Sequence, residues 1–209
     1  MAGVGVIRSK SSWANILDDH SNMSPHQYLN TFSRYQLDGY CLAILFSNRV
    51  FAGKVLGLSW RGNSKTRAGI CQTRTNVTTS EQGTEMLNLN SLFITMRTRH
   101  MKRIPLRMGV LNLVHEVLHS FGADHDPDTV ECGGRYLMSR YSGSGVHTNN
   151  HIISPCTGHS VSAVLGSQDM THCLAASGGV CGDGVLDDGE ECDCGDLEQC
   201  VLMNNRFVI

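Results

Sequence analysis

The sequence predicts an α/β fold, in which helices pack against a mostly parallel β-sheet and one helix carries a histidine cluster. Three observations favour this class. Short apolar runs have the length of buried strands, other segments place apolar residues at helical spacing, and the two kinds of segment alternate along the chain. The 209 residues suffice for one complete hydrophobic core plus a small additional module.

The first part of the chain is expected to contain a helix and two strands. Residues 25–36 have helical spacing, and Ser24 can cap this helix, with a proline in its first turn. The continuous apolar run 40–46 predicts a buried strand. The run 54–60 alternates better and predicts a half-exposed strand at an edge of the sheet.

The rest of the chain is expected to add one strand and two helices. The polar segment 61–88 is interpreted as a loop, and residues 89–96 as a further strand. Helices are predicted over 108–121 and 157–172, and a loop rich in Gly, Ser and Asn separates them over 127–150.

The composition is that of a globular protein without affinity for polyanions. The net charge is −2, 41% of residues are hydrophobic and 17% are charged, so nucleic acid is not an expected partner. No apolar run approaches the length of a transmembrane helix. Nine cysteines, together with possible glycosylation sites at Asn22 and Asn76, indicate an oxidising, extracytoplasmic compartment.

The cysteines indicate two modules. Five are widely spaced through the first 173 residues, whereas four crowd into the segment 181–200. The dense group is interpreted as a disulfide framework; a second zinc site is the alternative, and the spacing of Cys192 and Cys194 does not match the usual C-x-x-C ligand pair. A Ser-Gly-Gly stretch marks the boundary, so the predicted domains are 1–176 and 177–209.

The segment HEVLHSFGADHD, which begins at His115, carries the ligands of a catalytic zinc site. On a helix His115 and His119 lie one turn apart on the same face, so both rings can reach one metal ion. Gly122 permits a sharp turn after the helix, which returns His125 as a third nitrogen ligand. Three protein ligands leave one coordination position open, as catalytic zinc requires and structural zinc does not.

Glu116 follows the first ligand directly and is therefore the expected catalytic base. Its carboxylate projects beside the metal, where it can hold a water molecule and take its proton. The alternative is an ordinary amphipathic helix with exposed histidines, because a bare H-E-x-x-H occurs by chance. The extension to Gly122 and His125 adds constraints that such a helix need not meet, so a zinc metalloprotease site is favoured.

The order of motifs resembles the metzincin superfamily and, within it, the ADAM family (a disintegrin and metalloproteinase). The zinc motif is followed by the segment Tyr136-Leu137-Met138 and by the closing VCGDGVLDDGEECDCG. The runs YCLA, VLGLSW and GIC resemble the kuzbanian-type branch. The resemblance implies a metzincin-type protease domain over 1–176, without its first strand, and the truncated start of a disintegrin-like module over 177–209.

The resemblance also implies roles for individual residues. Met138 would form the methionine turn beneath the histidines, which nearly coincides with plain core packing. Asp126 would be a buried structural carboxylate. An edge strand would accept an extended substrate by backbone hydrogen bonds, and its residues would be Val55, Leu56, Gly57 and Leu58. The implied disulfides are Cys71–Cys173, Cys132–Cys156 and Cys194–Cys200, while the partner of Cys41 would lie in the missing strand.

A calcium site is a further implication for the disintegrin-like segment. Four acidic residues match positions that often bind calcium in the family, and oxygen ligands suit this hard cation. The residues are Asp183, Asp187, Glu190 and Asp193. The alternative is a solvated acidic loop.

Two further residues or segments depart from the family pattern. Leu118 stands where the family has glycine, and we expect its side chain to point toward the sheet. Residues 139–143 (SRYSG) replace a mostly apolar wall of the specificity pocket, so substrate preference does not carry over.

The predicted function is that of a zinc-dependent metalloendopeptidase acting on extracellular or cell-surface proteins, with membrane-protein ectodomains as the expected substrates. The expected location is extracellular or at the cell surface, and a membrane anchor is expected only in a longer parent protein. The alternative is a non-catalytic binding or adhesion protein with a degenerate or incomplete protease domain.

Overall fold

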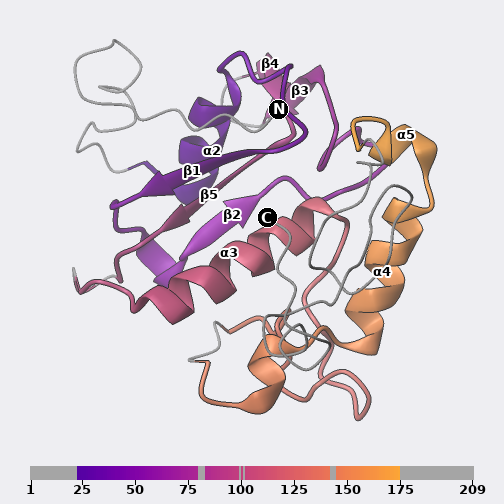
Figure 1. Ribbon diagram of the computed structural model, residues 1–209. Coiled ribbons are helices and arrows are strands. Elements are labelled where there is room, and N and C mark those ends of the chain that lie inside the picture. The colour runs from indigo at the N-terminus through magenta and orange to yellow at the C-terminus, as the bar shows by residue number, and fades with distance from the viewer. Residues whose placement is uncertain (1–22, 80–82, 99, 101, 142–144, 175–209) are drawn as a thin grey trace, which may run out of the picture. The chain divides into compact units, whose positions relative to one another are not determined.

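The computed structural model describes residues 23–79, 83–98, 100, 102–141 and 145–174 (Figure 1). The chain divides into two compact units, 1–173 and 174–209, and every element below belongs to the first. The described elements are α2 (Pro25–Ser33), β1 (Ala43–Ser47), η1 (Ala52–Lys54), β2 (Gly57–Ser59), β3 (Arg74–Thr79), β4 (Gly83–Asn88), β5 (Ser91–Thr95), α3 (Leu106–Ser120), η2 (Thr148–His151), α4 (Pro155–Leu165) and α5 (Gln168–Thr171). The predicted α/β class is confirmed.

The central sheet has three described strands in the order β1-β5-β2. Strand β1 runs parallel to β5, with Ala43 opposite Ser91, whereas β2 runs antiparallel to β5, with Gly57 opposite Ile94. The described part of the sheet is therefore mixed. As predicted for the 54–60 run, β2 lies at an edge, because β5 is its only partner among the described strands.

Helix α2 begins where the sequence predicts. The Ser24 hydroxyl accepts a hydrogen bond from the backbone of Gln27, and the Gln27 side chain accepts one from the Ser24 backbone, which forms a capping box. The helix packs on the sheet through aromatic edges, since the ring of Tyr28 lies 5.0 Å from Phe93 and 5.1 Å from Phe51, centroid to centroid. These rings form the centre of one core cluster.

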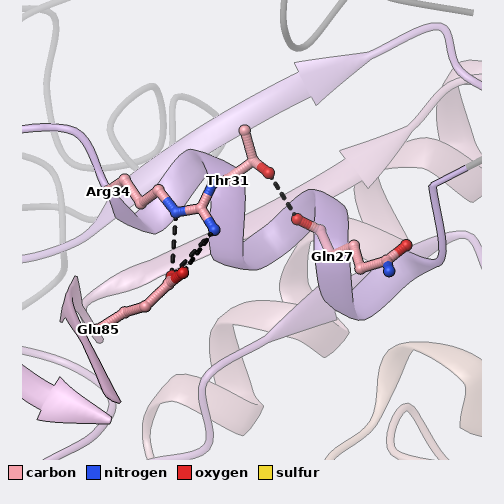
Figure 2. Close-up of polar contacts among 4 residues, drawn as sticks. All are labelled: Gln27, Thr31, Arg34 and Glu85. Atoms are coloured by element: carbon pink, nitrogen blue, oxygen red, sulfur yellow. Dashed lines mark hydrogen bonds and ion pairs between the residues drawn. The ribbon is translucent and has the colours of Figure 1, made fainter. Parts of the chain in front are cut away.

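Polar contacts fix the end of α2 (Figure 2). The Thr31 hydroxyl donates to the backbone oxygen of Gln27, one turn earlier in the helix, at 2.8 Å. Arg34, the C-cap residue, reaches across to β4 and donates to both carboxylate oxygens of Glu85 at 2.9–3.0 Å. This bidentate pair connects the helix to the hairpin that follows the second strand.

The loop predicted over 61–88 is wrong in its second half, where β3 and β4 form an antiparallel hairpin. Its register runs from Arg74 opposite Asn88 to Thr79 opposite Gly83. The hairpin is rich in threonine and other polar residues, and of its apolar side chains Leu87 is fully buried. Polar composition therefore concealed a pair of strands that β-branched threonines favour.

Helix α3 packs against β5 and β2 (Figure 1). One side-chain link runs from Asn112, whose amide nitrogen donates at 2.8 Å to the carbonyl oxygen of Leu56, the residue before β2. The final helix predicted over 157–172 is divided, because α4 ends at its C-cap Gly166 and α5 follows after Ser167. In the described part of the chain, no helix is both long and apolar enough to cross a membrane.

Two of the implied disulfides are confirmed. Cys71 is bonded to Cys173 and Cys132 to Cys156. Among the described cysteines Cys41 is free, and its thiol donates to the backbone oxygen of Cys173 at 3.3 Å. The implied pair Cys194–Cys200 lies outside the described residues.

Candidate metal and catalytic site

The predicted histidine cluster forms because α3 ends abruptly after its second histidine. Gly122 adopts a left-handed conformation, with φ of 91°, and its N–H donates to the carbonyl oxygen of His119 at 2.8 Å. The next residue, Ala123, donates to the carbonyl oxygen of Leu118 at 3.0 Å. These bonds close the helix and turn the chain so that His125 faces His115 and His119.

The three imidazoles converge on one point. The Nε2 atom of His125 lies 3.2 Å from that of His115 and 3.3 Å from that of His119. The ring centroids are 4.8–5.2 Å apart. Two nitrogen ligands that each lie about 2.0–2.1 Å from a tetrahedral zinc ion are separated by about 3.3 Å, so the donor spacing fits zinc.

Backbone carbonyls fix the tautomers of the two helical histidines. The Nδ1 atom of His115 lies 2.9 Å from the oxygen of Leu137, and that of His119 lies 2.7 Å from the oxygen of Ala123. A carbonyl can only accept, so each Nδ1 carries the proton and each Nε2 offers a lone pair to the centre. The donor set is therefore chemically complementary to a cation.

The surroundings keep the imidazoles in the neutral form that binds metal. Burial lowers the pKa of all three, and that of His119 to about 4. For His125 the nearby cation Arg140 acts in the same direction as burial. Neutral imidazoles at physiological pH are ready to coordinate without first releasing a proton.

Glu116 lies in the same cleft as the histidines but is nearly inaccessible, with 5% of its surface exposed. Its Oε2 accepts a hydrogen bond of 2.8 Å from the Ser59 hydroxyl on β2. Burial raises the pKa of Glu116 to about 7, and the Ser59 hydrogen bond partly opposes this rise. A carboxyl group with such a pKa can both take and return a proton near neutral pH.

Met138 is fully buried, and the carbonyl oxygen of the preceding Leu137 lies 2.9 Å from Nδ1 of His115. Met138 packs in one cluster with Ala123 and Leu118, so the expectation that Leu118 points toward the sheet is wrong. The helical rotation of about 100° per residue explains the error, because Leu118 lies two residues after Glu116 and so nearly opposite the face that meets β2. Leucine at this position fills space beside the methionine.

Asp126 connects the third histidine to α4. Its N–H donates to the carbonyl oxygen of Met138 at 2.9 Å, and its Oδ1 accepts hydrogen bonds from the hydroxyls of Ser154 and Thr157, the latter at 2.9 Å. Its other carboxylate oxygen is buried and has no partner in the described part of the chain. The geometry agrees with a structural carboxylate.

The histidines and Glu116 open into a cleft of about 460 Å³. The predicted edge-strand residues line it, namely Val55, Leu56, Gly57 and Leu58. Arg140 lines it as well, and an ion pair between Arg61 and Asp124 lies in its wall. The predicted ligands, base and strand are thus brought together in one cavity.

Several contributors to the site are not evident from the sequence. These are the carbonyls of Leu137 and Ala123, the hydroxyls of Ser154 and Thr157, and Ser59. Apart from Ala123, which lies four residues after its partner His119, their partners lie 22 to 57 residues away in the chain, so no local spacing pattern marks them. The possible calcium ligands Asp183, Asp187, Glu190 and Asp193 lie outside the described residues, and that site stays a prediction.

Comparison with known proteins identifies the family. Residues 6–167 match the model of the reprolysin-like metallopeptidases of family M12B. The chain is 33% identical to disintegrin and metalloproteinase domain-containing protein 10 of Homo sapiens over 193 residues, which cover 86% of this chain and 25% of that protein. It is also 32% identical to the disintegrin and metalloproteinase domain-containing protein 17 homolog of Caenorhabditis elegans over 179 residues, which cover 75% of this chain and 25% of that protein.

The match therefore spans about a quarter of the length of these relatives. Membership of a metallopeptidase family implies a zinc cofactor, and the donor chemistry of the three histidines is compatible with it. The chain belongs to the reprolysin-like M12B family of metallopeptidases.

Proposed function

We propose that this protein is a zinc-dependent endopeptidase that cleaves extended polypeptide segments. One observation carries the proposal: three imidazole nitrogens converge at zinc spacing in the same cleft that holds a buried glutamate. Three protein donors leave a coordination position for the reaction. In this proposal His115, His119 and His125 hold the metal.

Glu116 acts as general base and then as general acid. Zinc, when bound, polarises the scissile carbonyl and lowers the pKa of a water molecule beside it. Glu116 takes the proton from the attacking water and passes it to the nitrogen of the leaving amine. Its Oε2 accepts a hydrogen bond from Ser59, which holds the carboxylate in the cleft that the three histidines line.

The edge strand β2 aligns the substrate. Leu56 directs its carbonyl oxygen, and Trp60 its N–H, toward β5. Backbone groups alternate along an antiparallel strand, so those of Gly57 and Ser59 face the free edge. A substrate segment that adds there as a further strand is held by backbone hydrogen bonds that are independent of its side chains.

The sequence and the names of the relatives together favour a cell-surface setting for this protein. We propose that its substrates are extracellular proteins, especially membrane-protein ectodomains, and that it acts at the cell surface. The two native disulfides support an oxidising location. In the same proposal residues 1–176 form the protease domain and 177–209 begin a disintegrin-like module.

Zinc content and chelator-sensitive cleavage test the proposed function. The purified chain should contain one zinc ion and cleave a quenched fluorescent peptide, cleavage should stop with a chelator, and added zinc should restore it. Folded protein that binds no zinc and cleaves nothing would contradict the proposal and favour a binding or adhesion role.

A further inference from the structure

The base Glu116 is held by a side chain that belongs to the substrate strand. Its carboxylate oxygen Oε2 accepts a hydrogen bond of 2.8 Å from the hydroxyl of Ser59. Among the described residues, Ser59 provides the one side-chain donor to this carboxylate. With 5% of Glu116 exposed, little solvent is available to replace that donor.

The strand also fits the shape of the glutamate. A Cβ atom added to Gly57 would lie 2.6 Å from Cγ and 2.7 Å from Oε1 of Glu116, closer than non-bonded atoms approach. Residues 57 and 59 direct their side chains to the same face of β2. The missing side chain of Gly57 therefore leaves the space in which the carboxylate lies, and Ser59 binds one end of it.

A second contact fixes this strand relative to the helix. Asn112, which is 8% exposed, donates from Nδ2 to the carbonyl oxygen of Leu56 at 2.8 Å. Asn112 precedes Glu116 by one helical turn, so the two side chains lie on the same face of α3. The distance from Ser59 to Glu116 is thus set by helix–strand packing, and does not depend on a flexible loop.

On this basis we infer that Ser59 is a positioning residue, which holds Glu116 in the orientation needed for proton transfer. The inference rests on the proposed function. The hydroxyl binds Oε2, while Oε1 lies beside Gly57 of the same strand. Because Ser59 lies in the strand that we propose binds substrate, the same short segment aligns both the scissile peptide and the base.

Replacement of the Ser59 hydroxyl distinguishes a role in positioning Glu116 from a role in binding substrate or zinc. In Ser59→Ala we expect kcat to fall by about tenfold, because a hydrogen bond to a charged group is lost, while KM and the zinc content stay unchanged. Ser59→Thr retains a hydroxyl and should recover most of kcat. Ser47→Ala is the matched control, since Ser47 lies in β1 at the other described edge of the sheet, outside the cleft.

A wild-type kcat in Ser59→Ala, or a Ser59→Thr variant as slow as the alanine variant, would overturn the inference. The orientation of the Glu116 carboxylate gives a second test that does not depend on measuring cleavage. Crystal structures should show the Glu116 carboxylate in one orientation in the wild type and displaced in Ser59→Ala. An unmoved carboxylate would also overturn the inference, whereas absence of cleavage by the wild type itself would contradict the proposed function.

Discussion

The Nδ1 atom of His115 lies 2.9 Å from the carbonyl oxygen of Leu137, the residue before the buried Met138. This bond joins the histidine helix to the methionine segment 22 residues later. It orients the imidazole and directs its lone pair to the centre of the cluster. The segment that leads into Met138 therefore contributes a backbone acceptor to the histidine cluster.

The third histidine should be required for metal binding and dispensable for folding. His125 is exposed and follows the helix, so His125→Ala removes one ligand without opening the core. Loss of a residue that only hydrogen-bonds a metal ligand typically lowers metal affinity by about 10–100-fold, and we expect loss of the ligand itself to lower zinc affinity by more than this. Competition with a chromophoric chelator measures this, and His159→Ala on the exposed part of α4 is the control. Unchanged affinity in His125→Ala would remove His125 from the ligand set.

Zinc should stabilise the folded chain. The site exists only when folding brings the three histidines together, so zinc binds the folded state. Such a ligand raises the free energy of unfolding by RT ln(1 + [L]/Kd), which is about 2.7 kcal/mol when the free ligand concentration is a hundred times Kd. Thermal unfolding followed by circular dichroism should therefore show a higher Tm with zinc than with chelator. The same Tm under both conditions would show that no zinc binds the folded site.

The Asp126 carboxylate should stabilise the segment after the third histidine. Asp126→Ala removes the acceptor for Ser154 and Thr157 at the start of α4, and we expect the free energy of unfolding to fall by about 2–3 kcal/mol. Asp126→Asn keeps one acceptor oxygen and should lose less. Urea unfolding in the presence of a chelator measures both without a contribution from metal. Equal stability of the alanine variant and the wild type would contradict this role.

The two disulfides should differ in their effect on stability. Cys71–Cys173 closes a separation of 102 residues and Cys132–Cys156 one of 24. If restriction of the unfolded chain dominates, their removal by paired Cys→Ala substitution lowers the free energy of unfolding by about 4.7 and about 3.4 kcal/mol, respectively. Denaturant unfolding without reductant compares the two. A larger loss for the shorter loop would show that native-state contacts outweigh chain entropy.

Much of the candidate site could be predicted because its residues are close in sequence. Helical periodicity determines the spacing of His115 and His119, and Gly122 permits the turn to His125. The cap at Ser24 was equally evident, because capping depends on residues three positions apart. The pairs Cys71–Cys173 and Cys132–Cys156 followed from family resemblance, since spacing alone does not determine connectivity.

The features that were missed depend on tertiary contacts or on the absence of an apolar pattern. The bond between Ser59 and Glu116 spans 57 residues, and a serine in a strand is unremarkable until the helix packs against it. The direction of Leu118 depended on which helical face meets the sheet. The hairpin of β3 and β4 exposes mostly polar side chains, so hydrophobic periodicity did not mark it.

Replacement of Glu116 tests the central claim most directly, because it separates metal binding from catalysis. Glu116→Ala leaves all three histidines in place, so the variant should bind one zinc ion per chain, measured by elemental analysis, and cleave the quenched peptide at least about 10²-fold more slowly than the wild type. Cleavage at the wild-type rate by a zinc-loaded Glu116→Ala chain would contradict the assignment of Glu116 as the base.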